Sequence, residues 1–390
     1  MKILEFEAKA LLAEQGLAVP AGQVVTRPVD AEAVASRLGR PVVLKAQVPA
    51  SGRLKAGGIR FAQTPAEAAA AASELLHARV RNFAVESVLV EERLEALDEI
   101  YAGVTYDSQT QMATLLTTRG GGAEVETDRD FIKRPFSMWT PFSDYVSREV
   151  VAELGVEGPV LVQLARIVAQ LARCFVSWDT TLLEINPLIL DRAGQWWLAD
   201  AHLELDDEAI YRQGPLLARV PASARLAARR TEFERRAAEI DRSDHRGVAG
   251  RLVQFDGDLG LLIGGGGASL TIMDAVLDAG LRPANYCEIG GNPSVWKIKE
   301  MTKLILSQPQ VRRLAVIMNV VSNTRVDLIA RGVIKGILEL SLNPPEVLVA
   351  FRVPGSWEGE GQAVLQHYGV TSFGRQDSID QVIEAIRWRS

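Results

Sequence analysis

The sequence contains few cysteines and no excess of positive charge. Its two cysteines, Cys174 and Cys287, lie far apart in apolar contexts within 390 residues. Such a pair does not form the disulfide framework of a small secreted domain, and it favours a reducing, cytoplasmic environment. The net charge of −6 argues against a general nucleic-acid-binding protein, which would carry a basic patch.

Long apolar runs are also scarce. We find no run of the roughly 18 apolar residues that a membrane-spanning helix needs. Glu5 and Glu7 interrupt the apolar residues at the N-terminus. We therefore predict neither a signal peptide nor a membrane span.

Common nucleotide-binding and catalytic patterns are missing as well. The sequence has no P-loop pattern GxxxxGK[ST] and no GxGxxG with a following acid. Four histidines show no metal-ligand spacing and no nucleophilic context: His77, His202, His245 and His367. A nucleotide would therefore need a different kind of cradle.

The pattern of the chain changes along its length. Residues 1–225 mix helical and strand signals, which predicts an α+β domain with several antiparallel strands. Residues 226–247 are charged and rich in Arg and Ala, and we expect them to form a helical linker. Residues 248–390 alternate strands with helices, which predicts a doubly wound parallel sheet.

The main expected elements can be placed by periodicity and turn signals. In the first domain we predict helices at 4–16, 65–77 and 160–177, and strands at 41–48, 87–92, 100–106 and 111–118. In the second domain we predict strands at 259–264, 284–289, 313–319, 346–351 and 370–374, and helices at 268–280, 294–307, 326–341, 359–369 and 378–388.

Polar residues within apolar β-runs are the strongest functional signal. Glu184 and Asn186 stand in the run LLEINPL, and Asp200 ends the next strand. Such groups are costly among Leu and Ile unless they have partners. Mg²⁺ prefers oxygen ligands and shares its shell with water and phosphate, so we expect Asn186 and Asp200 to be metal ligands. Glu184 shares a strand face with Asn186 and could orient a cationic or imidazole partner.

A second signal surrounds Lys45, which ends the apolar run PVVLK. A lysine in a buried strand usually has an anionic partner such as phosphate, although an edge-strand lysine in solvent is the alternative. The loop at 51–58 mixes glycines with cations, as a mobile phosphate lid would, or it is a plain turn. Glu91 and Glu99 could accept hydrogen bonds from a nucleotide, or they could be solvated acids.

Two loops of the second domain could bind an acid. The first, Gly264–Ser269, follows a β-run and opens a helix, where backbone N–H groups attract anions, although a tight βα turn is the alternative. The second supplies hydroxyl and amide groups after another strand. Arg352 could be a carboxylate clamp or a surface residue. The candidate acid-binding residues are Gly265, Gly266, Gly267, Ser269, Ser322, Asn323, Thr324 and Arg352.

With these residues in view, nearly the whole chain resembles the β subunit of succinyl-CoA synthetase and related nucleotide-dependent acid–CoA ligases. That family pairs an ATP-grasp domain with a flavodoxin-like CoA-ligase domain. The landmarks occur in family order: FEAKALLAEQGLAVP at 6–20, VLKAQV at 43–48, GRLKAGG at 52–58, VLVEE at 88–92, GGAEVE at 121–126, LEINPL at 183–188, FDGDLG at 255–260 and RPANY at 282–286.

The resemblance implies roles for individual residues. Lys45, Gly52 and Arg53 are similar to the family's phosphate-contacting residues. We also expect a catalytic role for Lys45. Glu91 and Glu99 are similar to the family's nucleotide-binding acids. Asn186 and Asp200 are similar to its Mg²⁺ ligands. Glu184 resembles an acid that meets a phosphohistidine brought by the α subunit, and Pro20 is similar to the residue of ATP-preferring members. The family's α subunit also carries the CoA site, so the resemblance implies an αβ or α₂β₂ complex.

The departures from the family pattern gather at the expected acid site. Gly264 stands where the family has Asn, and Asn319–Thr324 replaces a glycine-rich carboxylate loop. These segments and Arg352 look more like ATP-citrate lyase and citryl-CoA synthetase. In the nucleotide half, Leu54 replaces a glycine and Leu94 replaces a frequent Thr.

Three hypotheses follow. The first is an ATP- and Mg²⁺-dependent acid–CoA ligase β subunit acting on a di- or tricarboxylate, with succinate and citrate both open. The second is a degenerate subunit that binds nucleotide without turnover. The third is an ATP-grasp ligase that joins an acid to an amine, which the C-terminal domain argues against.

Overall fold

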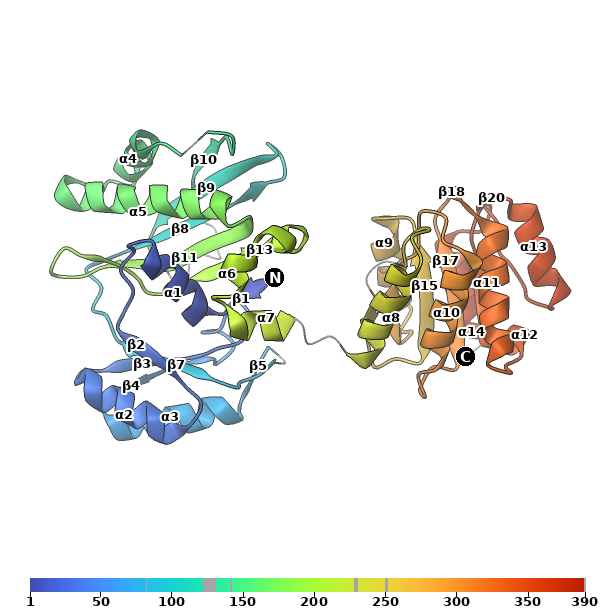
Figure 1. Cartoon of the computed structure of the whole chain (residues 1–390), viewed down its shortest axis with the longest axis horizontal. Coiled ribbons are helices and arrows are strands. Elements are labelled where there is room, and N and C mark those ends of the chain that lie inside the picture. Colours follow the sequence, from blue (N-terminus) through green and yellow to red (C-terminus); the bar gives the residue numbers. More distant parts are fainter. Residues whose placement is uncertain (82, 122–130, 141, 228–230, 250–251, 389–390) are drawn as a thin grey trace. The chain divides into compact units, whose positions relative to one another are not determined.

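The computed structural model describes all residues except 82, 122–130, 141, 228–230, 250–251 and 389–390. The family landmark at 121–126 therefore lies outside the described residues from 122 onward. The chain forms two compact units, Met1–Arg229 and Arg230–Ser390, which Figure 1 shows in blue to green and in yellow to red.

The larger sheet of the first unit is antiparallel. Its order is β1-β13-β11-β8-β9-β10, with β12 paired to β11. The strands are β1 (Lys2–Ile3), β8 (Asp98–Asp107), β9 (Met112–Arg119), β10 (Ile132–Phe136), β11 (Thr180–Leu190), β12 (Trp196–Leu198) and β13 (His202–Leu205). The helices α1 (Glu5–Glu14), α4 (Asp144–Glu153) and α5 (Gly158–Ser177) share its apolar core.

Among the described residues, α5 is one helix that is long and apolar enough to cross a membrane, although Arg166 and Arg173 interrupt its sequence. Half of its apolar window is buried inside the unit, as in the core helix of a soluble protein. It packs on β8 and β11, with Leu164, Val168 and Leu171 fully buried. The length of this helix is therefore weak evidence for a membrane span.

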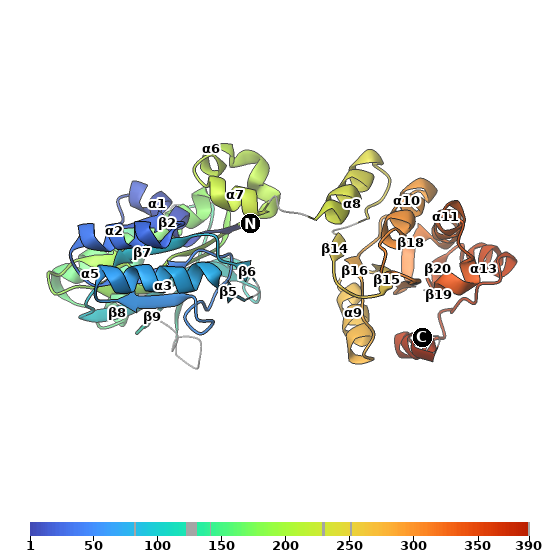
Figure 2. The ribbon, with the colours of Figure 1, turned by 90° about the horizontal axis from the view of Figure 1, so that it is seen from below.

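The second sheet of this unit has the order β2-β7-β3-β4, with all pairs antiparallel. Its strands are β2 (Gly22–Val25), β3 (Val42–Ala46), β4 (Ile59–Ala62) and β7 (Val88–Glu92). Two helices, α2 (Pro28–Leu38) and α3 (Pro65–His77), cover it (Figure 2). Thr64 caps α3 by accepting from the Glu67 N–H, and Ala68, Ala72 and Leu75 face the core.

Short elements complete the first unit: β5 (Arg79–Val80), β6 (Phe83–Ala84), the 3₁₀ helix η2 (Asp207–Arg212), α6 (Gly214–Leu217) and α7 (Pro221–Ala227). The end of this region is tied back to the first helix. Glu7 of α1 accepts hydrogen bonds from the N–H groups of Ala222 (2.8 Å) and Ser223 (3.0 Å).

The second unit contains the expected parallel sheet. Its central strands β15 (Leu259–Gly264), β17 (Arg313–Met318) and β19 (Leu348–Arg352) run in that order. Bridges add β16 (Asn285–Cys287) beside β15, through Ile263 and Glu288, and Phe373 beside Arg352. This gives the flavodoxin-like order 2-1-3-4-5. The predicted strand at 370–374 is reduced to that single bridge.

Helices lie on both faces of this sheet (Figure 2). One face carries α9 (Ala268–Asp278) and α14 (Ile379–Trp388). The other carries α8 (Glu232–Ser243), α10 (Val295–Leu306), α11 (Val326–Glu339) and α13 (Glu358–His367). The remaining elements are α12 (Pro344–Val347), β14 (Leu252–Gln254), β18 (Val321–Arg325) and β20 (Gly355–Ser356).

The position of α8 differs from the expected linker at 226–247. Phe233 and Ala237 of α8 are buried in the core of the second unit. The Lys297 ammonium of α10, which is 1% exposed, pairs with Asp241 at 2.9 Å. Residues 232–243 are therefore an integral helix of the second unit.

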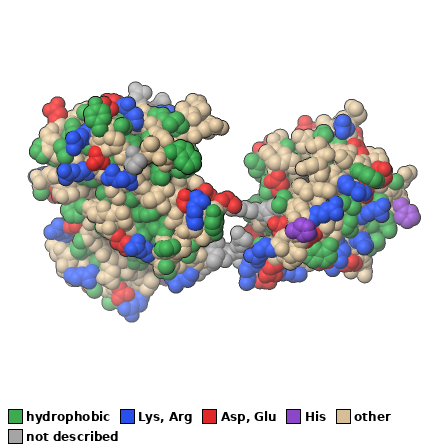
Figure 3. All heavy atoms as spheres, turned by 45° about the horizontal axis from the view of Figure 1, so that its top comes forward, with side chains coloured by type: hydrophobic (Ala, Val, Ile, Leu, Met, Phe, Trp, Pro, Cys, Tyr) green, Lys and Arg blue, Asp and Glu red, His purple; other side chains and the backbone are tan. Residues whose placement is uncertain are grey.

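One face of each unit is drawn with its side chains coloured by type in Figure 3. On the face drawn in Figure 3, positive and negative side chains are interspersed. This mixture agrees with the small negative net charge of the sequence.

Candidate nucleotide and acid sites

The first unit contains a cavity of about 650 Å³ lined by residues of both its sheets. A cavity of this size can hold a ligand such as a nucleotide. It gathers every candidate nucleotide, catalytic and metal residue that the sequence predicted: Pro20, Lys45, Gly52, Arg53, Glu91, Glu99, Glu184, Asn186 and Asp200. Leu54 and Leu94 line it as well.

Lys45 is held in the cavity wall by carboxylates. It is the penultimate residue of strand β3 and is 6% exposed. Its ammonium nitrogen lies 2.8 Å from Glu5 Oε1 and 3.0 Å from Glu91 Oε2, and it also donates to the Ala199 carbonyl. Burial alone would lower the pKa of Lys45, but Glu5, Glu91 and Asp200 outweigh burial and raise it. Lys45 is therefore a fixed cation.

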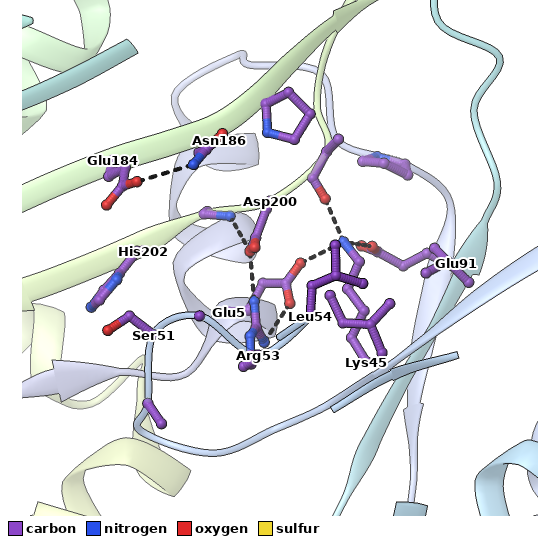
Figure 4. Close-up of a pocket in the computed structure, with 18 of the residues that line it drawn as sticks. Glu5, Lys45, Ser51, Arg53, Leu54, Glu91, Glu184, Asn186, Asp200 and His202 are labelled. Atoms are coloured by element: carbon purple, nitrogen blue, oxygen red, sulfur yellow. Dashed lines mark hydrogen bonds and ion pairs between the residues drawn. The ribbon is translucent and has the colours of Figure 1, made fainter. Parts of the chain in front are cut away.

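Arg53 reaches the same group of carboxylates from the loop after β3. Gly52, at φ +65°, adopts the left-handed conformation that glycine tolerates best. The Arg53 guanidinium lies 2.7 Å from Glu5 Oε2 and 2.7 Å from Asp200 Oδ1. Figure 4 shows these contacts, with Glu5 linked to both cations. Burial lowers the pKa of Arg53, but Asp200 and Glu5 outweigh burial and raise it.

Glu5 and Lys9 of α1 complete this cluster, although neither was a predicted site residue. Both are 3% exposed. The Lys9 ammonium lies 2.7 Å from both Glu91 oxygens and 3.0 Å from Glu5 Oε1. The spacing of four residues between Glu5 and Lys9 was the sequence signal that could have suggested an ion pair on this helix. Such an i,i+4 pair usually lies on an exposed face, so it did not indicate a site.

Glu184 and Asn186 lie on β11, and Asp200 follows β12. The Asn186 amide donates to Glu184 Oε1 at 3.4 Å. Asp200 Oδ1 accepts from the Ala201 N–H at 2.8 Å, and its side chain is 30% exposed. The sequence thus brings an amide and a carboxylate to one cavity.

These donors fit Mg²⁺ bound with a nucleotide. The part of the chain that the structure describes contains no group of three His, Cys, Asp or Glu side chains that could hold a metal. Mg²⁺ usually takes one or two protein carboxylates together with phosphate and water, rather than a full protein cage. Asp200 and Asn186 therefore suit a metal that enters with phosphate.

Three more predicted nucleotide-binding residues, Pro20, Glu91 and Glu99, also line the cavity. Glu99 lies at the start of β8 and lines the cavity with Pro20. Glu91 is 2% exposed and paired with Lys9 and Lys45. Its carboxylate is thus engaged by cations in this structure.

His202 also lines the cavity, although its sequence context gave no functional signal. It lies directly across the strand pair from Glu184. Its Nε2 lies 3.0 Å from Glu204 Oε1. Burial lowers the pKa of His202 and outweighs the opposing effect of Glu204, so the imidazole is neutral at neutral pH.

In the second unit, the predicted acid-binding loops lie at one edge of the sheet. The register pairs Gly264 with Met318 and Ile317 with Arg352, so the carboxyl ends of β15, β17 and β19 coincide. Ligands of doubly wound sheets bind at this edge. It carries every candidate acid-binding residue: Gly265, Gly266, Gly267, Ser269, Ser322, Asn323, Thr324 and Arg352.

The side chains at this edge differ in how they are engaged. Ser269 is fully buried, and its hydroxyl lies 2.6 Å from the Tyr286 hydroxyl, which donates to Glu288. Thr324 is 1% exposed and accepts from the Asn292 N–H at 3.3 Å. Ser322 and Asn323 are exposed.

Arg352 is 6% exposed, so it is not a surface residue. Its guanidinium donates to the carbonyls of Met318 and Asp377, each at 2.7 Å. Burial lowers the pKa of Arg352, against the opposing effects of Asp377 and Glu358. These bonds hold the ends of neighbouring strands together.

Family models match both units. Residues 2–190 match the ATP-grasp domain, and residues 229–353 match the citrate-binding region of ATP citrate lyase. The first match confirms the predicted ATP-grasp fold, and the two together define the class of ATP-dependent acid–CoA ligases.

Curated relatives identify the family within this class. The chain is 36% identical to the succinate–CoA ligase (ADP-forming) subunit beta of Chloroflexus aurantiacus, over 94% of this chain and 93% of that one. It is 34% identical to the GDP-forming subunit beta of Thermus thermophilus, over 94% and 93%. It is 31% identical to the ADP-forming subunit beta of Ignicoccus hospitalis, over 99% of both chains. The chain belongs to the family of succinate–CoA ligase β subunits.

A solved structure shares the fold of the whole chain. ATP citrate lyase from Methanothrix soehngenii, in complex with citrate and coenzyme A, has a TM-score of 0.69 and covers 99% of both chains at 18% identity. At this identity the likeness concerns the fold alone.

Proposed function

We propose that this chain is the nucleotide-binding β subunit of an ATP-dependent acid–CoA ligase. The observation that carries the proposal is the cavity of about 650 Å³ in the first unit. Its lining includes Lys45, Arg53, Asn186 and Asp200. Phosphoryl transfer depends mainly on positioning and charge stabilisation. Two fixed cations and two oxygen donors supply these requirements.

In the proposed reaction, the nucleotide lies with its phosphates between Lys45 and Arg53. Asn186 and Asp200 would hold Mg²⁺, which would neutralise phosphate charge. Glu99 and Pro20 line the nucleotide-facing wall. Glu91 holds Lys45 in position, because its carboxylate lies 3.0 Å from the Lys45 ammonium.

The phosphoryl acceptor is a histidine of a partner α subunit. Glu184, on the strand that carries Asn186, orients that imidazole. CoA binds mainly to the same partner, in a cytoplasmic αβ or α₂β₂ complex. The partner and its histidine rest on the resemblance to acid–CoA ligases and on the curated names of β subunits.

The acid is a di- or tricarboxylate bound at the carboxyl edge of the second unit. Transfer of the phosphoryl group from the partner histidine to its carboxylate would free the imidazole and give an acyl phosphate. Attack of the CoA thiolate on the acyl carbon would then form the thioester and release phosphate. The match of 229–353 to a citrate-binding model favours citrate as a second candidate beside succinate. Exposed donors such as Ser322 and Asn323 would contact its carboxylates.

ADP release by the chain co-purified with its α partner tests this function. Mg·ATP and CoA are supplied, and the acid is varied across succinate, malate and citrate, with omission of CoA as the control. Acid-dependent ADP release with acyl-CoA formation is expected. A complex that releases no ADP with any acid would contradict the proposal, and success only with an amine acceptor would identify a different ligase.

The acid site has its own test. Asn323→Ala removes an exposed amide at the edge of the second unit without touching the nucleotide cavity. We expect a higher KM for the preferred acid and an unchanged KM for ATP, because a hydrogen bond to a charged group contributes about 1.5–3 kcal/mol. Gln362→Ala on α13 is a matched control outside the loops. An unchanged acid KM for Asn323→Ala would remove this residue from the site.

A further inference from the structure

The nucleotide cavity is backed by a nearly closed set of six charges. Three cations, Lys9, Lys45 and Arg53, face three carboxylates, Glu5, Glu91 and Asp200. Asp200 has 30% of its side chain exposed, while the other five side chains have 9% or less. A buried charge left without a partner is strongly destabilising, so each of the five buried charges needs at least one partner of opposite sign.

Glu5 is the centre of this set. Its Oε1 lies 2.8 Å from Lys45 and 3.0 Å from Lys9, and its Oε2 lies 2.7 Å from Arg53. Its side chain lines the cavity but is only 1% exposed, because the three cations surround its carboxylate. Burial alone would raise the pKa of Glu5, but Arg53, Lys45 and Lys9 outweigh burial and hold it well below its usual range.

The Arg53 guanidinium is shared between two carboxylates. One side contacts Glu5 and the other contacts Asp200, both at 2.7 Å (Figure 4). Asp200 is also the charged oxygen donor that suits Mg²⁺. Arg53 and the Ala201 N–H both bond to Oδ1 of Asp200. A Mg²⁺ ion that took this oxygen would compete with the guanidinium, and Glu5 would determine how strongly Arg53 depends on Asp200.

We propose that Glu5 is a positioning residue of the nucleotide site, which anchors Lys45 and Arg53 so that Asp200 can exchange the guanidinium for Mg²⁺ when the nucleotide binds. This rests on the proposed nucleotide site, but it does not depend on the acid. With Glu5 in place, Arg53 keeps one carboxylate after the exchange and turns its free N–H groups to phosphate.

The substitution Glu5→Gln keeps the shape of the side chain and removes its charge. Arg53 then has Asp200 as its remaining carboxylate within the cluster, so Mg²⁺ must displace a stronger pair. We expect the affinity for Mg·ADP to fall on the order of 10- to 100-fold, the range typical of partners that orient a metal site. The half-saturating Mg²⁺ concentration for ADP release should rise in parallel.

Whether Mg·ADP affinity falls or rises in Glu5→Gln distinguishes a positioning role of Glu5 from an effect of its negative charge alone. Removing one negative charge near an anion site would by itself strengthen binding of an anionic nucleotide. A weaker affinity therefore reports lost geometry rather than lost repulsion. Unchanged or tighter Mg·ADP binding in a folded Glu5→Gln complex would overturn the proposal.

A matched control lies two residues along the same helix. Glu7 is also 3% exposed, but it accepts from Ala222 and Ser223 and does not line the cavity. Glu7→Gln should lower the melting temperature and leave Mg·ADP affinity unchanged. Equal losses of affinity in both variants would mean that Glu5 acts only through the stability of α1.

A second variant keeps the test decisive if Glu5→Gln does not fold. The double substitution Glu5→Gln, Lys9→Met leaves two cations and two carboxylates, which restores the balance of buried charge. We expect its melting temperature to recover while Mg·ADP affinity stays low. Recovery of both together would overturn the proposal.

The readout is isothermal titration calorimetry of Mg·ADP on the complex with its α partner, followed by the Mg²⁺ dependence of ADP release. Calorimetry does not require the acid to be known. If wild-type complex binds Mg·ADP but shows no acid-dependent turnover, the proposed ligase function fails while the role of Glu5 is still tested. If Mg·ADP does not bind to wild-type complex, both proposals fail.

Discussion

Asp200 pairs with Arg53 and is the proposed charged ligand of Mg²⁺. Asp200→Asn keeps the size of the side chain but removes the charge proposed to hold Mg²⁺. We expect turnover to fall by more than about 100-fold, beyond the loss usual for an outer partner of a metal ligand. The measurement is ADP release by the α/β complex at limiting and saturating Mg²⁺.

The fold of the Asp200→Asn variant should persist. The Asp200 side chain is 30% exposed, and Arg53 retains Glu5 at 2.7 Å. Thermal unfolding should therefore shift by only a few degrees, since about 1 kcal/mol moves the melting temperature of a 150–250-residue domain by about 2–4 °C. Wild-type activity at limiting Mg²⁺ would contradict the metal assignment.

The pKa of Glu5 predicts acid sensitivity. It lies well below the ordinary 4.5, because the three cations outweigh burial. A depressed folded-state pKa stabilises the fold above the unfolded-state value, and this stability is lost as pH falls through the lowered pKa. The free energy of unfolding should therefore decline below pH 4.5 in wild type and decline less in Glu5→Gln, as measured by denaturant titration across the acidic range.

At the scale of elements, the packing of α8 determines where the boundary between the two units lies. Phe233 is 5% exposed in the core of the second unit. Phe233→Ala should destabilise that unit by about 3–5 kcal/mol, the cost of removing a buried aromatic side chain. Exposed Arg236→Ala on the same helix is the control and should change stability by about 0.5 kcal/mol or less.

Denaturant unfolding of both variants provides the measurement. If α8 were a solvent-exposed linker, Phe233→Ala and Arg236→Ala would have similar small effects. A large difference between them would support the boundary near residue 230.

The strongest elements could be predicted from sequence because their local signals agree with their burial. Helix α3 matches the predicted 65–77, with Thr64 and Pro65 at its start. The five predicted helices of the second unit all form, within a few residues at their ends. Helices α2 and α4 were not predicted, and neither were β2, β4 and β10. The strands among them are short or partly exposed, so their apolar periodicity is weak.

The linker expectation shows where composition misleads. Residues 232–243 are dominated by Glu and Arg, and a few apolar positions, chiefly Phe233 and Ala237, are buried. Tertiary packing on α10 and β14 determines the position of this helix. A charged helix with one narrow apolar face looks the same in sequence whether it packs or connects.

Polar residues that interrupt strands were the candidates that the sequence could offer. Lys45, Glu184, Asn186 and Asp200 all line the cavity. Glu5 and Lys9 were not predictable in the same way, because buried charge on a helix resembles a solvated face until its partners on β3 and β7 are known. His202 became visible only through its register opposite Glu184.

At the scale of the whole molecule, the two units divide the proposed chemistry. The first unit carries the nucleotide cavity, and the second carries the edge proposed for the acid. The described lining of the nucleotide cavity belongs to the first unit, and the candidate acid-binding residues belong to the second. Each should therefore respond independently to substitution, so that Asn323→Ala changes acid kinetics and Glu5→Gln changes nucleotide binding, with additive effects in the double variant.

The proposed reaction requires a partner subunit. Among the described residues, His202 is the histidine that lines the cavity, and it is already bonded to Glu204. The phosphoryl acceptor that we propose is a histidine of the α subunit. We expect the isolated chain to bind Mg·ADP in calorimetry but to form no acyl-CoA from Mg·ATP, acid and CoA. Addition of the α partner should restore turnover and ³²P-labelling of α. Labelling of this chain instead, abolished by His202→Gln, would place the acceptor here and remove the need for a partner histidine, because the neutral imidazole of His202 would then be the nucleophile.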